Sequence, residues 1–246
     1  MDTELIKREI ETFVVFFKRQ IEVVNALSCL PDEMVAVTAH EDVTLHKKIV
    51  YVSLLDCFAS LRFHEAAHGQ LARHNKKRFT LFLKECADWN VGGLTSLVFL
   101  DDWLQEASPG GRLAQYVTEK LTILGNDFGD TVSAIDVDEE PETLFKFSST
   151  EAEKEAILHC QHYSIMYRYR NNLVHQARRP GGACEMLGEN QSEACYHTYA
   201  GNPAIYLLYP IALFKKLCTS SLENVDHYLQ ENNLDPYGVE VDPRCF

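Results

Sequence analysis

Basic and amide side chains cluster in the second half of the chain, in a pattern that could bind a phosphate and act on it. Between Ala156 and Cys184 the sequence contains no acidic residue, although the chain of 246 residues has a formal net charge of −13 at pH 7. Among the side chains in this window are those of Arg168, Arg170, Asn171, Asn172, His175, Arg178 and Arg179. Guanidinium groups are permanently charged and bind phosphate oxygens in a bidentate manner. We therefore expect the window to bind an anion.

Arginine and histidine together can cleave RNA without a metal ion. Histidine exchanges a proton near neutral pH, so it can deprotonate the ribose 2′-OH or protonate the leaving oxygen. An arginine beside it can stabilise the charge that develops on the phosphate in the transition state. One histidine cannot easily perform both proton transfers at once. A dimer that brings two such helices together would supply two.

The window is expected to be helical. Because a helix turns by about 100° per residue, its side chains fall into three stripes along the helix. The apolar stripe, which should face the core, contains Leu158, Ile165, Tyr169 and Leu173. The polar stripe contains Ser164, Arg168, Asn171 and His175. The third stripe, suited to packing against another helix such as that of a second copy, contains Tyr163, Tyr167, Arg170 and Val174.

The string from Arg170 through Asn171 and Asn172 to His175 resembles the R-x4-6-H signature of HEPN domains (higher eukaryotes and prokaryotes nucleotide-binding). In that family a polar residue commonly follows the arginine, as Asn171 does here. HEPN domains are helical bundles, often dimeric, and many are metal-independent endoribonucleases of toxin–antitoxin, CRISPR and phage-defence systems. Residues 48–56 and 75–79 are also similar to upstream helices of some bacterial HEPN-like proteins.

The resemblance implies a catalytic site formed by Arg170, Asn171 and His175. The surrounding side chains expected to bind the substrate are Arg168, Asn172, Arg178 and Arg179. The R-x4-6-H spacing alone is also met by the pairs Arg62–His68 and Arg168–His175. On an ideal helix about 140° separates Arg170 from His175, so these two side chains do not share a face. They would converge across a dimer cleft or through distortion near the helix end.

We therefore expect a metal-independent endoribonuclease of HEPN type in a toxin or phage-defence context. It would act on RNA as a homodimer, without a cofactor or metal, with an antitoxin or defence-system protein as a further partner. The alternative is a non-catalytic HEPN-like module that binds a nucleotide, RNA or a protein through its arginines.

A remote alternative is a zinc hydrolase, because residues 64–68 read His-Glu-Ala-Ala-His. On a helix His64 and His68 share a face and could bind Zn²⁺, with Glu65 as the general base. The extended form of this motif needs glycine three residues after the second histidine, and Leu71 stands there. We interpret the segment as a solvated helix end rich in histidine.

The elements that must position these residues are predicted to be helices. Apolar residues recur every three or four positions in the ranges 2–30, 42–68, 75–91, 94–104, 113–124, 150–179 and 210–229. The predicted fold is a single all-α, HEPN-like bundle over 1–246 with extra helices. Residues 126–149 are expected to form a solvated acidic loop, 150–179 the motif helix and 233–246 a tail. The irregular segment after Pro180 could include a short hairpin.

Composition limits the compartment and the partners. No apolar run approaches the 18 or more residues that span a bilayer, and the start of the chain lacks the zones of a secretory signal. We expect a cytoplasmic protein with reduced, buried cysteines and no membrane partner. The overall negative charge argues against non-specific coating of nucleic acid, so any such contact must be local.

Overall fold

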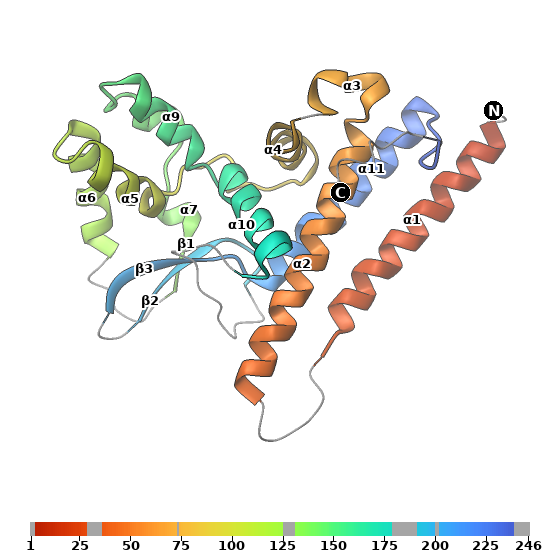
Figure 1. The fold of residues 1–246 in the computed structure, drawn as a ribbon, viewed down its shortest axis with the longest axis horizontal. Coiled ribbons are helices and arrows are strands. Elements are labelled where there is room, and N and C mark those ends of the chain that lie inside the picture. Colours follow the sequence, from red (N-terminus) through yellow and green to blue (C-terminus); the bar gives the residue numbers. More distant parts are fainter. Residues whose placement is uncertain are drawn as a thin grey trace. The chain divides into compact units, whose positions relative to one another are not determined.

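The computed structural model describes residues 3–28, 36–72, 74–124, 131–178, 191–199 and 202–238. Within these ranges the chain forms eleven helices and one three-stranded antiparallel sheet (Figure 1). The predicted helical architecture is confirmed, and the all-α prediction missed the sheet except for the short hairpin suggested after Pro180. The chain divides into two compact units. No helix in the described ranges is both long enough and apolar enough to cross a bilayer.

Unit 1 is built from both ends of the chain, residues 1–89 and 214–246, with residues 173–178. Its helices are α1 (Thr3–Ala26), α2 (Ala36–Arg62), α3 (Glu65–Ala72), α4 (Asn75–Cys86) and most of α11 (Ile211–Asn232). The Phe17 ring of α1 lies 5.1 Å from the Phe58 ring of α2. The thiol of Cys218 in α11 donates to the Tyr51 carbonyl of α2 at 3.3 Å. The two ends of the chain therefore share one core.

Unit 2 comprises residues 90–172 and 179–213. Its helices are α5 (Leu97–Ala107), α6 (Arg112–Leu124), α7 (Ala134–Val137), α8 (Pro141–Phe145), α9 (Glu151–His159) and α10 (His162–Gln176), of which α10 ends in unit 1. The strands β1 (Thr131–Ser133), β2 (Cys195–Tyr199) and β3 (Asn202–Leu208) lie in the order β1-β2-β3. The antiparallel pair β2–β3 falls where the sequence suggested a short hairpin.

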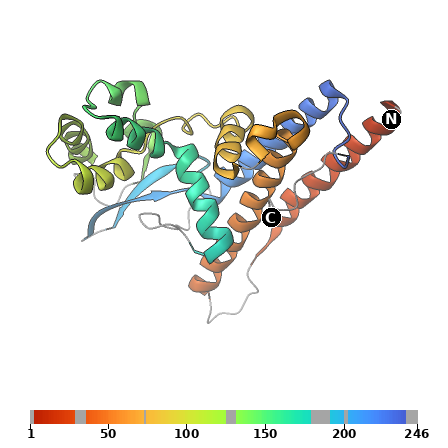
Figure 2. The same cartoon turned by 45° about the horizontal axis from the view of Figure 1, so that its top comes forward.

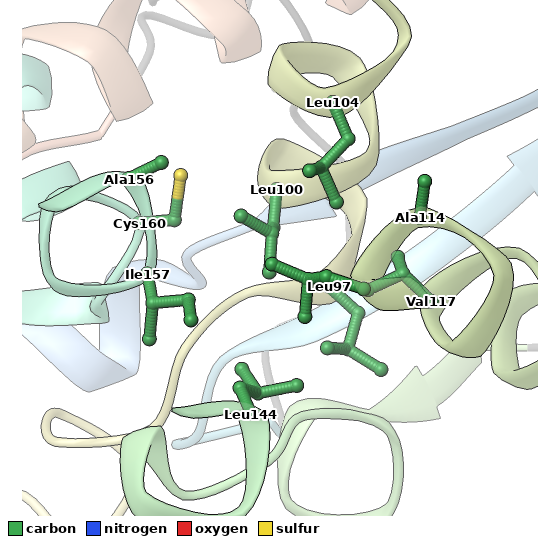
Figure 3. Close-up of a cluster of buried hydrophobic side chains, with 10 residues drawn as sticks. Leu97, Leu100, Leu104, Ala114, Val117, Leu144, Ala156, Ile157 and Cys160 are labelled. Carbon is green, nitrogen blue, oxygen red and sulfur yellow. The ribbon is translucent and has the colours of Figure 1, made fainter. Parts of the chain in front are cut away.

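The apolar core of unit 2 is formed where α5, α6, α8 and α9 meet (Figure 3). Leu97, Leu100 and Leu104 recur at three and four positions along α5, which is why they point to one side of that helix. Leu144 of α8 and Ile157 of α9 pack against them with no exposed surface. Complete burial of a leucine or isoleucine contributes about 1.5–3 kcal/mol. This core holds α9, and with it the start of α10.

The predicted motif helix 150–179 is two helices, α9 and α10. The helix begins where it was predicted to begin, at a capping box that Thr150 and Glu153 form. The helix is interrupted because the segment 92–96 takes its backbone hydrogen bonds. The Ser96 N–H donates to the Cys160 carbonyl at 2.9 Å, and the Tyr163 N–H donates to the Gly92 carbonyl at 2.9 Å. These long-range bonds replace those of a continuous helix.

The acidic segment 126–149 differs from a solvated loop in its described part, residues 131–149. This part contains β1, α7 and α8. The carboxylate of Asp138 is fully buried and Leu144 has no exposed surface. The physical reason is that Asp138 accepts a hydrogen bond from the Leu97 N–H at the start of α5, at 3.0 Å. A free N–H at a helix start attracts a carboxylate.

Candidate functional site

The polar stripe predicted for the motif helix lies on α10, and Arg168 is its first cation. Arg168 is exposed, and its guanidinium lies over the Phe99 ring, 5.2 Å from the ring centroid. A guanidinium over an aromatic face keeps its charge and its outward-facing donors. Arg168 is therefore available to an anion from solvent.

Arg170 has a different environment from Arg168. Only 8% of it is exposed, and its Nη1 atom donates to Asn171 Oδ1 at 2.9 Å. Asn171 and Asn172 are both partly buried. Two of the three residues that the resemblance assigns to the catalytic site are thus bonded to each other, and the guanidinium is turned mostly away from solvent.

His175 and Arg178 lie where α10 ends. Both are exposed. The helix stops because Ala177 adopts a left-handed conformation with φ of 48°, and its N–H donates to the Leu173 carbonyl at 3.1 Å. This is the single-bond form of the left-handed helix cap. The Arg178 Nε atom donates to Gln176 Oε1, which holds the Arg178 side chain close to the helix end.

Helix geometry brings some of the predicted residues together and separates others. Arg168 and His175 are seven positions apart, so they lie within about 20° of each other around α10. Arg170 and His175 are about 140° apart and do not share a face of this helix. Arg179 lies outside the described residues. The exposed basic side chains of the predicted site are therefore Arg168 and His175, on one face of α10, and Arg178, just beyond its end. We call these three residues the α10 stripe.

A second polar cluster, which the sequence did not reveal, is fully buried in unit 2. Asp138 accepts from the Tyr196 hydroxyl at 2.9 and 2.8 Å and contacts His162 Nε2 at 2.6 Å. His162 Nδ1 lies 2.7 Å from the Tyr209 hydroxyl, and the Ser96 hydroxyl lies 2.7 Å from that of Tyr196. We call these five residues the Asp138 network. No sequence signal marks it, because its members come from five separate segments of the chain.

Burial sets the protonation of the two tyrosines in the Asp138 network. Burial, and then the nearby charge of Asp138, raise the pKa of Tyr196 well above its usual value of 10.0. The same two causes raise the pKa of Tyr209. Both hydroxyls therefore keep their protons and remain donors. His162 has no exposed surface, so the network is built to hold its elements together rather than to meet a substrate.

The His-Glu-Ala-Ala-His segment does not form one regular helix. His64 precedes α3, which begins at Glu65, and His68 has non-helical angles of φ −139° and ψ 43°. The shared face that the zinc motif needs is therefore not formed. Burial, followed by the charges of His68 and Arg62, lowers the pKa of His64. Across the part of the chain that the structure describes, no group of three or more His, Cys, Asp or Glu side chains is placed to hold a metal ion.

Comparison with known proteins found no relative of this chain. No family model matches the chain, and no curated protein or solved structure matches it either.

Proposed function

We propose that the protein binds RNA along the α10 stripe and cleaves it without a metal ion, in the manner of a HEPN ribonuclease. The observation that carries the proposal is that Arg168 and His175 lie exposed on one face of a helix whose surroundings in the sequence contain no acidic residue. Their spacing is set by the helix itself. A guanidinium and an imidazole about ten ångströms apart along α10 suit contact with successive phosphates of one strand, since each residue rises about 1.5 Å.

In this mechanism His175 accepts the proton of a ribose 2′-OH. The 2′ oxygen then forms a bond to phosphorus, and the bond from phosphorus to the 5′ oxygen breaks. The leaving oxygen takes a proton from water or from the His175 of a second copy. Arg168 binds a neighbouring phosphate of the same strand and so holds the reacting group at His175. The products are a 2′,3′-cyclic phosphate and a free 5′-hydroxyl.

The burial of Arg170 favours a second candidate, a HEPN-like module that binds RNA or a nucleotide without cleaving it. With 8% of its surface exposed and a hydrogen bond to Asn171, Arg170 reaches a phosphate only if its side chain changes position. Binding along the α10 stripe needs no such change. The toxin or phage-defence context, with its antitoxin or other partner, belongs to the first candidate.

The test is cleavage of labelled single-stranded RNA in EDTA. The wild-type protein should produce 2′,3′-cyclic phosphate ends, and His175→Ala should reduce the rate by about 100-fold or more, as expected for loss of a general base. His159→Ala is the matched control, because His159 is also exposed and lies in the same acid-free window, on α9. Cleavage that survives in His175→Ala, or is equally lost in His159→Ala, rules out the assignment of His175.

Binding without cleavage would select the second candidate. In that case RNA affinity should fall with increasing salt, and Arg168→Ala should weaken it while Arg112→Ala, a change at the start of α6, should not. An affinity that neither salt nor Arg168→Ala changes would exclude both candidates.

A further inference from the structure

Helix α1 has a second apolar face that unit 1 does not bury. Its inner face contributes Ile6, Ile10 and other residues to the core, as expected for an amphipathic helix. On the outer side Leu5 is 45% exposed, Phe16 51% and Val23 50%. Figures 1 and 2 both show α1, in red, beside α2, with its other side turned away from the other helices of unit 1.

The outer side chains of α1 include a line of six positions at heptad spacing, of which three are apolar and three are polar. Steps of four and three residues alternate along one line, which consists of Leu5, Glu9, Thr12, Phe16, Arg19 and Val23. On an ideal helix this line covers an arc of roughly 80°, so it forms one continuous strip, which we call the α1 seam. Alternating steps of four and three are the pattern with which one helix packs along another.

We propose that the α1 seam binds the α1 seam of a second copy of this chain, in antiparallel orientation. In the register in which paired positions add to 28, Leu5 lies opposite Val23 of the partner subunit, and Thr12 lies opposite Phe16 of the partner subunit. The remaining layer places Glu9 opposite Arg19 of the partner subunit. No layer then sets like charges against each other.

Charge selects this orientation. A parallel pair in register would place Glu9 against the partner's Glu9 and Arg19 against the partner's Arg19, and like charges at such positions destabilise a helix pair. The antiparallel pair turns both layers into attractive ones. Neither Glu9 nor Arg19 forms an ion pair with another described residue of its own chain. Both charges are therefore available across the seam.

The positions that flank the seam fit the same arrangement. Antiparallel pairing brings Val15 close to the partner's Val15, and Val15 is the most exposed of the large apolar residues of α1, at 66%. It also brings Arg8 close to Glu22 of the partner subunit. Glu22 already lies 3.3 Å from Lys215, and a carboxylate has room for both cations. Seam and flank thus favour one orientation.

The α1 proposal does not rest on the RNA chemistry proposed above, and oligomeric state alone tests it. Sedimentation velocity of the full chain at up to about 100 µM should show a dimer of the wild type, since a helix pair with polar layers is expected to have micromolar affinity. Glu9→Arg and Arg19→Glu should each weaken the dimer by at least about tenfold, because each converts two attractive pairs into two repulsive ones. A parallel pair would not be weakened in this way.

Rescue makes the test specific. An equimolar mixture of the Glu9→Arg and Arg19→Glu proteins should form a heterodimer, and the double variant E9R/R19E should recover self-association. Lys18→Glu is the control, because Lys18 is exposed on α1 outside the seam. Circular dichroism checks that all variants keep their helices. A monomeric wild type, a dimer indifferent to both single substitutions, or failure of the double variant to re-associate would each overturn the proposal.

Discussion

The Nε2 atom of His162 lies 2.6 Å from the Oδ2 atom of Asp138, and neither side chain has any surface exposed to solvent. Asp138 follows α7, and His162 is the first residue of α10. A buried carboxylate is costly unless donors surround it. Here the donors are the Leu97 N–H, the Tyr196 hydroxyl and the His162 ring. The carboxylate thereby joins α5, α10 and β2, and fixes the start of the helix that carries the α10 stripe.

Replacement of Asp138 by asparagine should destabilise the protein strongly. The amide keeps the size of the carboxylate but brings two donors into a site that already contains donors. We expect the free energy of unfolding to fall by about 2–4 kcal/mol, measured by urea denaturation. Asp136→Asn is the control, because Asp136 is exposed two positions away and should change stability by less than about 0.5 kcal/mol. Equal effects of the two substitutions would contradict this role for Asp138.

The raised pKa values of Tyr196 and Tyr209 predict a loss of stability in alkali. Above pH 10 the unfolded chain releases these phenolic protons while the folded chain keeps them, so the unfolded state binds fewer protons and stability falls as the pH rises. Below about pH 10 the contribution is complete. Buried thiols such as that of Cys218, whose pKa burial also raises, add to the decline. Between about pH 9 and 11 the free energy of unfolding should therefore fall less steeply with pH in the double variant Y196F/Y209F than in the wild type, although it should still fall.

The capping box at the start of α9 predicts a loss of stability in acid. Burial alone would raise the pKa of Glu153, but hydrogen bonds from the Ser149 N–H, the Ser108 hydroxyl and Thr150 outweigh it and hold the pKa below 4.5. The stabilisation is thus present above about pH 4.5 and is lost as the pH falls. At neutral pH Glu153→Ala should lower the free energy of unfolding by about 1–2 kcal/mol. In acid the free energy of unfolding should then depend less on pH than in the wild type. Glu155→Ala, an exposed change on the same helix, should do neither.

Gly92 should tolerate no side chain. A Cβ atom at this position would lie 2.1 Å from the Tyr163 ring, which packs on Gly92 where α10 begins. We expect Gly92→Ala to lower the free energy of unfolding by about 2 kcal/mol or more. Gly69→Ala should be neutral or stabilising, because no atom lies within 4 Å of the place that its Cβ would take. A double-mutant cycle with Tyr163→Ala should show that the cost of Gly92→Ala depends on the ring. Additive effects would refute the contact.

Local patterns predicted the elements that local forces determine. The apolar spacing of α1 and the capping box of Thr150 and Glu153 depend on residues within a few positions of each other, and both helices begin within one residue of their predicted starts. The break between α9 and α10 was not predicted, because it depends on a hydrogen bond between Cys160 and Ser96, which lie far apart in the sequence. The third helix was predicted to extend to residue 91, whereas α4 ends at Cys86.

The candidate site was predicted in the same partial way. Helix spacing correctly placed Arg168 and His175 on one face, because both belong to one continuous helix. Burial of Arg170 was not foreseen, since it depends on how the chain packs around that residue. Asp138 was assigned to a solvated loop because other acidic residues surround it in the sequence. Only the folded structure supplies its partners, which come from positions 97, 162 and 196.

The division of unit 1 between the two ends of the chain has a consequence for synthesis on the ribosome. Helices α1, α2 and α4 emerge early, but α11, whose Cys218 bonds to Tyr51 in their shared core, is made after all of unit 2. The Ser220 hydroxyl, for example, bonds the Ala87 carbonyl at 2.7 Å across 133 positions of sequence. Long-range pairing of this kind is slow to form. Until α11 is made, the N-terminal helices therefore lack part of the core that they share with it, whereas unit 2 can fold first.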